Sequence, residues 1–231
     1  MNKLAPRLLA EFLGTLGLLA VVVGSGIMAE RLAGGNVAVA LLANALATGA
    51  ALIALIAAFG GVSGAHFNPV VSAMQAWRGA ITGKTAVAYG VAQVIGALAG
   101  VVLAHAMFEL PLVQCSAHIR TGIGQWLSEI VATVGLLLVI HGTVRHRPDA
   151  VPYAVAGYVT AGYWFTASTC LANPAVTIAR ACTDTFSGIR PQDAPGFILA
   201  QIVGLVLALA LMCLLQNSEE NPVENPKEKH K

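Results

Sequence analysis

The sequence predicts an all-α membrane protein with six transmembrane helices and two short half-helices, related to one another as an inverted repeat. Hydrophobic residues make up 57% of the 231 positions and charged residues only 10%, less than half the charge of a typical soluble domain. Six apolar stretches are separated by short polar connections. Two shorter segments begin with Asn-Pro, one in each half of the chain.

A helix needs roughly 20 mostly apolar residues to cross a bilayer, so six spans and short connections would use nearly all of this length. The first span carries Glu11 and lacks a small-residue cleavage pattern, so we expect it to be retained rather than cleaved as a signal peptide. Residues 1–215 are expected to form one membrane domain, followed by a disordered cytoplasmic tail at 216–231. The spans are expected at 8–28, 37–59, 85–108, 124–144, 151–165 and 196–215.

Two segments, 69–77 and 174–182, are too short to span and are predicted to be half-helices. Proline is suited to the first position of a helix, and asparagine before it is a favoured N-cap. Asn68 and Asn173 would therefore start these half-helices from opposite faces of the membrane, with their ends meeting near its middle.

An internal repeat relates the two halves, 8–108 and 124–215. Residues 10–22 resemble 128–140, which aligns Glu11 with Glu129, and AQVIG at 92–96 matches AQIVG at 200–204. Because each half has three spans, the second half enters the membrane from the opposite side. Interrupted helices at matching positions of an inverted repeat mark a permeation or binding site.

The distribution of Lys and Arg predicts that both termini are cytoplasmic, by the positive-inside rule. The net charge of +2 is too small to indicate a nucleic-acid partner. The four cysteines have no metal-ligand spacing, so we expect no metal, no cofactor and no enzymatic activity. The cationic residues expected on the cytoplasmic side are Lys3, Arg7, Arg78, Lys84, Arg145, Arg147, Lys227, Lys229 and Lys231, against Arg31, Arg120, Arg180 and Arg190 on the other.

Four motifs in order, AEFLGT, SGAHFNPV, AQ-x-x-G and ANPAV, resemble the major intrinsic protein family of aquaporins and aquaglyceroporins over residues 8–215. The resemblance implies a channel domain for small neutral solutes and water, a homotetramer in a lipid bilayer, and the inner membrane of a bacterium. The run YWFTASTCLANPAVTIAR is similar to bacterial channels associated with arsenic resistance. That subgroup implies passage of metalloid hydroxides or methylated arsenicals beside glycerol-sized polyols.

The two boxes have a physical role that does not depend on the resemblance. Converging half-helix N-termini carry partial positive charge, which repels protons and cations but spares neutral solutes. The asparagine amides can donate hydrogen bonds to a passing oxygen. By the family pattern, the pore-lining carbonyls would come from the segments before the boxes, with the His66 side chain at the cytoplasmic end. The boxes are Asn68, Pro69, Val70 and Asn173, Pro174, Ala175; the expected lining residues are Gly64, Ala65, His66, Thr169, Cys170 and Leu171.

Glu11 and Glu129 lie within apolar spans, where an ionisable side chain is costly. One interpretation is a proton relay of a coupled transporter. The other, which the resemblance favours, is that each carboxylate accepts hydrogen bonds from backbone N–H groups of a re-entrant loop. Gln93 and Gln201 would have similar buried polar roles.

The expected selectivity filter departs from the family pattern. Val176 stands where most members have an arginine, and Val70 stands in the first box for the usual alanine. Arg180 lies four residues beyond Val176, so we expect it to serve in the vestibule or to pair with Asp184 rather than to complete the filter. The predicted filter is Thr48, Ala161 or Gly162 (Trp164 if the loop is shortened), Cys170 and Val176.

Such a filter would be wide and weakly charged, which disfavours strict water selectivity. Three alternatives remain open at this point. The chain could be a water-selective aquaporin or a plain glycerol facilitator, a secondary transporter built on the inverted repeat, or a structural membrane protein that does not conduct.

Overall fold

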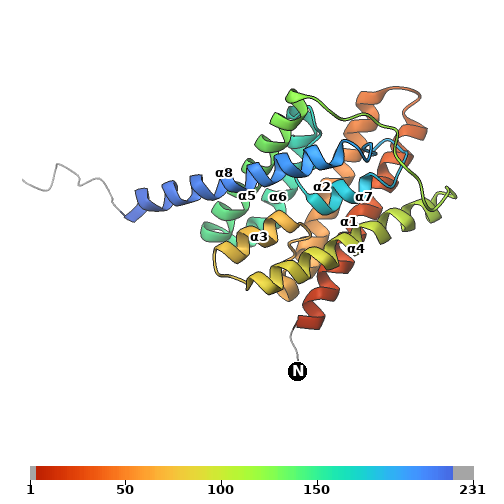
Figure 1. Ribbon diagram of the computed structural model, residues 1–231. Helices are drawn as coiled ribbons and strands as arrows, with labels where there is room; N and C mark the ends of the chain where they lie inside the picture. The colour runs from red at the N-terminus through yellow and green to blue at the C-terminus, as the bar shows by residue number, and fades with distance from the viewer. Residues whose placement is uncertain (1–3, 221–231) are drawn as a thin grey trace, which may run out of the picture.

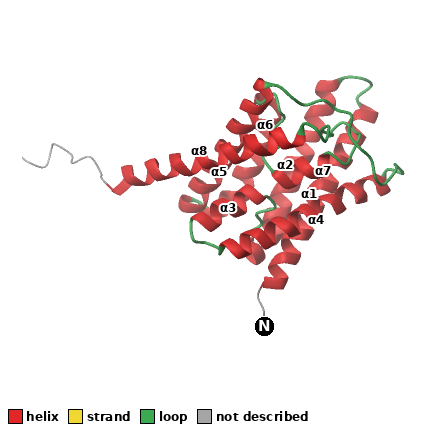
Figure 2. Cartoon of the chain, in the orientation of Figure 1, coloured by secondary structure: helices red, strands yellow, loops and turns green. Residues whose placement is uncertain are grey.

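The computed structural model describes residues 4–220, and within them the side chains up to residue 215. Every regular element in the described residues is a helix, and loops and turns join the helices (Figure 2). Its elements are α1 (Leu4–Leu32), α2 (Val37–Ser63), α3 (Pro69–Trp77), α4 (Gly83–Met107), α5 (Ile123–His146), the 3-10 helix η1 (Pro148–Ala150), α6 (Val151–Phe165), α7 (Pro174–Arg180) and α8 (Ala194–Glu220).

The predicted fold class is confirmed. Five described helices, α1, α2, α4, α5 and α8, are long and apolar enough to cross a membrane. The sixth, α6, has 15 residues and so extends only about 22 Å at 1.5 Å per residue. It is short because the chain leaves it at Thr166 for the loop that leads into α7. The short helices α3 and α7 lie within the bundle of longer helices (Figure 1).

Most predicted span ends differ from the helix ends by one to four residues, and two further boundaries differ as well. Helix α7 ends at Arg180, whereas 174–182 was expected. Helix α8 continues to Glu220 and so includes 216–220, which were predicted to be disordered. Nothing in that polar stretch breaks a helix before Pro222, which disfavours helical geometry in the residue preceding it. The remainder of the predicted tail, 221–231, lies outside the described residues.

The two halves pack in the same way. Helix α1 packs against α4, and its counterpart α5 packs against α8. Two glycines one turn apart on α4 allow the first contact: a Cβ on Gly96 would lie 2.4 Å from Phe12 O, and one on Gly100 2.3 Å from Leu16 O. Small residues at this spacing let helix backbones approach closely within a membrane.

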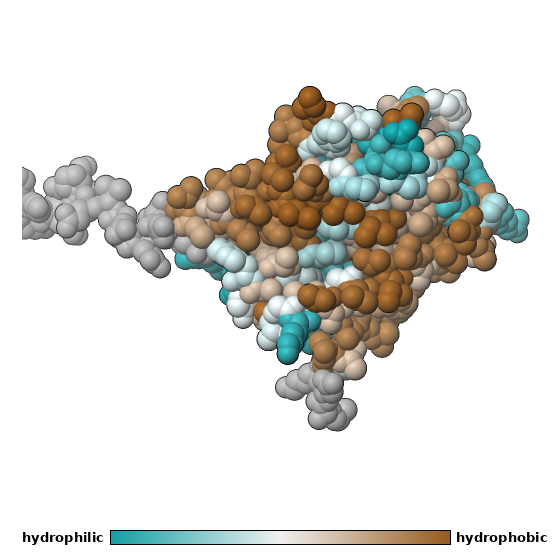
Figure 3. Space-filling model, viewed as in Figure 1, coloured by the Kyte–Doolittle hydropathy of each residue, from teal (hydrophilic) through white to brown (hydrophobic). Residues whose placement is uncertain are grey.

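The outer surface is apolar. Val87, Val91 and Ile95 are exposed at every fourth position of α4, and they form a stripe along one face of that helix. Brown hydrophobic surface covers much of the flank in view, with polar surface gathered mainly toward the ends (Figure 3). This surface suits contact with lipid tails rather than water.

Candidate functional site

The two half-helices begin at the predicted asparagines. Asn68 and Asn173 have extended backbones, with φ of −155° and −157°, and proline follows each. Asn68 Oδ1 accepts a hydrogen bond from Val70 N at 3.0 Å, and Asn173 Oδ1 accepts one from Ala175 N at 3.0 Å. Each asparagine therefore caps its own helix through its side-chain oxygen.

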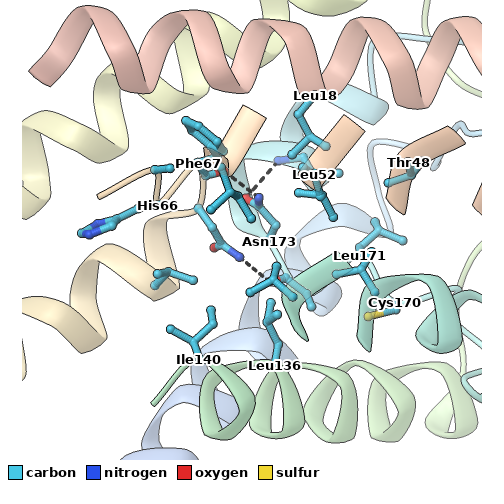
Figure 4. A pocket seen from close by; sticks show the side chains of 18 of the residues that line it. Leu18, Thr48, Leu52, His66, Phe67, Leu136, Ile140, Cys170, Leu171 and Asn173 are labelled. Carbon is cyan, nitrogen blue, oxygen red and sulfur yellow. Dashed lines mark hydrogen bonds between the residues drawn. The ribbon is translucent and has the colours of Figure 1, made fainter. Parts of the chain in front are cut away.

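The side-chain nitrogens of the same residues join the two halves. Asn68 Nδ2 donates to Ala172 O and Asn173 Nδ2 donates to Phe67 O, each at 2.8 Å (Figure 4). Each amide nitrogen carries a second hydrogen, for which no acceptor occurs among the described residues. Because both asparagines line the central cavity, that second N–H is available to a solute.

The loops that enter the half-helices have an unusual backbone. Ala65 and Phe67 before the first box have positive φ of 49° each, and Cys170 and Ala172 before the second have 53° and 45°. The same two positions of each loop are therefore left-handed, a conformation that costs energy for residues other than glycine. Other contacts must hold the loops in place.

Glu11 provides these contacts in the first half. It is fully buried, and its carboxylate accepts hydrogen bonds from His66 N at 3.0 Å and Phe67 N at 2.7 Å. Ser63 Oγ donates to it at 2.6 Å and Gln93 Nε2 at 2.8 Å. Four donors thus fix one carboxylate and, through it, the loop.

Glu129 does the same in the second half. It accepts hydrogen bonds from Leu171 N at 2.9 Å, Ala172 N at 2.8 Å and Gln201 Nε2 at 2.7 Å. Gln201 also donates to Thr177 Oγ1 on α7 at 2.9 Å. Neither glutamate lines the cavity, so the geometry favours loop support over a proton relay.

A cavity runs past both asparagines and has two unlike sides. One side is an apolar wall in which each helix contributes residues four apart, and so a single stripe. The other side carries the asparagine amides and the two loops. The apolar wall consists of Leu18 and Val22 of α1, Leu52 and Ile56 of α2, Leu136, Ile140 and Val144 of α5, and Val151, Val155 and Val159 of α6.

Beyond the second box, three predicted filter residues line the cavity: Thr48, Cys170 and Val176. From α6, Tyr163 lines the cavity at this level, whereas Ala161 and Gly162 do not. Tyr163 is buried, and its hydroxyl lies within hydrogen-bond distance of Thr48 Oγ1, at 3.2 Å. The α6 stripe at 151, 155 and 159 continues to 163, so helical spacing would have identified this residue, whereas counting from the family pattern did not.

At the opposite end, His66 lines the cavity together with Gly64 and Ala65, whereas Leu171 lines it beside Cys170 (Figure 4). His66 Nδ1 lies 3.0 Å from Ser72 Oγ, and the His66 ring packs edge-on against Tyr89 with centroids 5.3 Å apart. We call this end the His66 mouth. The end at Tyr163 and Arg180 is called the Arg180 mouth.

These features match one family. The family model of the major intrinsic proteins matches residues 2–156, more than half of the chain. The chain belongs to the major intrinsic protein family. Its members are membrane channels, so this major intrinsic protein is an integral membrane channel and not an enzyme.

Individual relatives agree with that assignment. This major intrinsic protein is 54% identical to aquaglyceroporin AqpS of Rhizobium meliloti, over 90% of this chain and 89% of that one. It is 30% identical to aquaporin AqpM of Methanothermobacter marburgensis, over 90% and 96% of the two chains. The X-ray structure of the aquaglyceroporin from Plasmodium falciparum has the same fold, with a TM-score of 0.69, 22% identity, and 95% and 98% coverage.

Several predicted site residues of this major intrinsic protein lie away from the cavity. Ala161 and Trp164 are exposed on the outer side of α6. Arg180 does line the cavity, and it does not pair with Asp184, whose Oδ1 accepts from Ala117 N at 2.8 Å. The residues absent from the lining are Pro69, Val70, Gly162, Thr169, Pro174 and Ala175, which shape the boxes and loops instead.

Gly162 has a different role from the predicted one, because it makes room for Cys170. A Cβ at position 162 would lie 2.6 Å from both Cβ and Sγ of Cys170. The Cys170 thiol therefore packs against α6. Figure 4 shows its sulfur, in yellow, beside the cavity wall. Helix α6 and the second loop are fitted to one another at this contact.

We expect Gly162→Ala to push the second loop toward the cavity. Solute flux should fall, and stability should decrease by roughly 1–3 kcal/mol, as for other overpacked sites. Adding Cys170→Gly should restore both, since it removes the clashing atoms and glycine tolerates the positive φ of 53°. Gly157→Ala on the same helix is the control, because a Cβ there meets nothing within 4 Å. Unchanged flux in Gly162→Ala would contradict this fit.

Proposed function

We propose that this protein is a passive channel for glycerol-sized polyols, neutral metalloid hydroxides or methylated arsenicals, and water, and that it excludes ions and protons. The observation that supports this most is the constriction of Thr48, Tyr163, Cys170 and Val176, which has no charged group at the position that follows the second box. A neutral constriction lined by the methyl groups of Val176, one thiol and two hydroxyls favours a bulky uncharged solute.

The two-sided cavity supports the same solute class. A polyol or metalloid hydroxide has oxygens that can accept from the free amide hydrogens of Asn68 and Asn173. Its remaining surface can rest on the apolar wall without losing hydrogen bonds. The name of the Rhizobium meliloti relative, an aquaglyceroporin, fits this class better than it fits water alone.

The proposed cellular setting follows from the charge distribution and the relatives. We place the channel in the inner membrane of a bacterium, with both termini in the cytoplasm and the Arg180 mouth facing outward. Its exposed apolar flanks would be shared between lipid and neighbouring subunits of a homotetramer.

A solute panel in proteoliposomes tests the proposal. Stopped-flow permeabilities to water, glycerol, urea, arsenous acid and a neutral methylated arsenical should be measured at equal protein density against empty liposomes. We expect glycerol and the arsenicals to cross at least tenfold faster than in empty vesicles. Water permeability alone, with no gain for the larger solutes, would identify a water-selective channel and contradict the proposal.

A further inference from the structure

Arg180 is a buried cation whose partner is a carbonyl. It lies on the last turn of α7, is 3% exposed and lines the cavity beside Tyr163. Its Nε donates to Ser187 O, and its two terminal nitrogens have no acceptor among the described residues. Those nitrogens therefore leave donors available to the cavity.

Arg120 reaches the same place from a different segment. It belongs to the loop between α4 and α5, which crosses the end of the bundle near the α7–α8 connection (Figure 1). Its Nε donates to Gly188 O at 2.8 Å, adjacent in sequence to the acceptor of Arg180. Its backbone N donates to Asp193 Oδ2 at 2.9 Å, and one terminal nitrogen lies 3.4 Å from Thr169 Oγ1 at the start of the second loop.

The two guanidinium groups repel each other, and the carboxylate that attracts both of them, Glu129, forms an ion pair with neither. Burial, and then the like charge of Arg180, lower the pKa of Arg120 to about 9, so Arg120 remains protonated at neutral pH. Within residues 4–215 neither side chain forms an ion pair, and the nearby Asp193 is paired with Arg190 at 2.8 Å. Two positive charges with no directly bonded carboxylate thus stand at the Arg180 mouth, where low dielectric strengthens their field.

We infer that Arg120 and Arg180 form an arginine pair that excludes cations at the Arg180 mouth, in place of the arginine absent at Val176. Each carries a full charge, whereas a half-helix end carries only about half of one. Arg180 lies seven residues from Asn173, about 10 Å along α7. The charge is thus set back from the second box, and position 176 itself stays neutral.

The inference rests on the proposed channel function and explains how a wide constriction can remain closed to ions. A single arginine at position 176 would narrow the pore and add charge at once. With the charge moved to the mouth, cations meet repulsion before they reach the constriction, while a neutral solute meets only hydrogen-bond donors.

The test compares ion and solute flux in the same proteoliposomes. In Arg120→Gln/Arg180→Gln, we expect proton and potassium conductance, each expressed relative to glycerol permeability, to rise at least tenfold over wild type. Arg31→Gln is the matched control, because Arg31 lies on the same side at the end of α1, over the Phe108 ring and away from the cavity. It should leave conductance unchanged.

A charge-preserving variant separates charge from folding. Arg120→Lys/Arg180→Lys keeps both charges and should still exclude cations, even if the loop loses its hydrogen-bond geometry. Unchanged conductance in the glutamine variant, or equal leaks in the lysine and glutamine variants, would overturn the inference. Absence of glycerol flux in wild type would instead contradict the proposed function, so the two failures are distinguishable.

Discussion

Glu129→Leu is expected to destabilise the folded channel strongly. The substitution leaves Leu171 N, Ala172 N and Gln201 Nε2 without their acceptor in a buried site. Each unsatisfied donor costs about 1–3 kcal/mol, so the sum approaches the whole stability of a typical protein, roughly 5–15 kcal/mol. The left-handed residues Cys170 and Ala172 would then lose the contact that opposes their strain.

Thermal unfolding in detergent, together with the yield of monodisperse protein, measures this effect. We expect a fall in apparent melting temperature of roughly 10 °C or more, at 2–4 °C per kcal/mol for this chain length. Glu129→Gln keeps one acceptor oxygen and should be intermediate. Glu30→Leu, at an exposed position of α1, should melt like wild type. If Glu129→Leu also melted like wild type, the carboxylate would not be holding the loop.

The second large effect is expected from Val176→Arg. Val176 is 6% exposed and lines the constriction with Thr48 and Tyr163. An arginine there adds bulk at the constriction, and it places a further cation one helical turn from Arg180. Glycerol and arsenous acid permeability should fall at least tenfold, while water, which needs a smaller opening, should change by less than about threefold.

Val176→Leu separates size from charge, since it adds bulk to the same wall without a charge. It should reduce glycerol permeability less than the arginine does. Stopped-flow light scattering on the same vesicle preparations gives all three permeabilities. Equal loss of water and glycerol flux, or no loss of either, would mean that position 176 does not form the constriction.

Much of the fold was predictable because membrane burial leaves a strong signal in sequence. Apolar length identified the spans, and the Asn-Pro boxes identified the start of both half-helices, since an N-cap and a proline act locally. The extension of α8 to Glu220 was not predictable from hydropathy, because a helix continues past its apolar stretch until something breaks it. Proline at 222 was the available signal.

The site residues that recur in both halves of the repeat were predictable. Those whose positions depend on the paths of the loops were not. Matching positions in the two halves pointed to Glu11 and Glu129, and both support the loops. Tyr163 was missed because the loop after α6 alters the count from the family pattern, although the stripe on α6 contained it. Arg120 was missed because its approach to Arg180 depends on two long connections whose paths have no periodic pattern.

The dependence of glycerol entry on concentration and on ion gradients tests the central claim most directly. Initial rates into proteoliposomes should be measured over a wide glycerol range, with and without proton and sodium gradients. A passive channel predicts a rate that rises linearly, ignores both gradients and ends with equal concentrations inside and outside. Saturation at low concentration, with accumulation above the external level when a gradient is imposed, would contradict the account and indicate a coupled transporter.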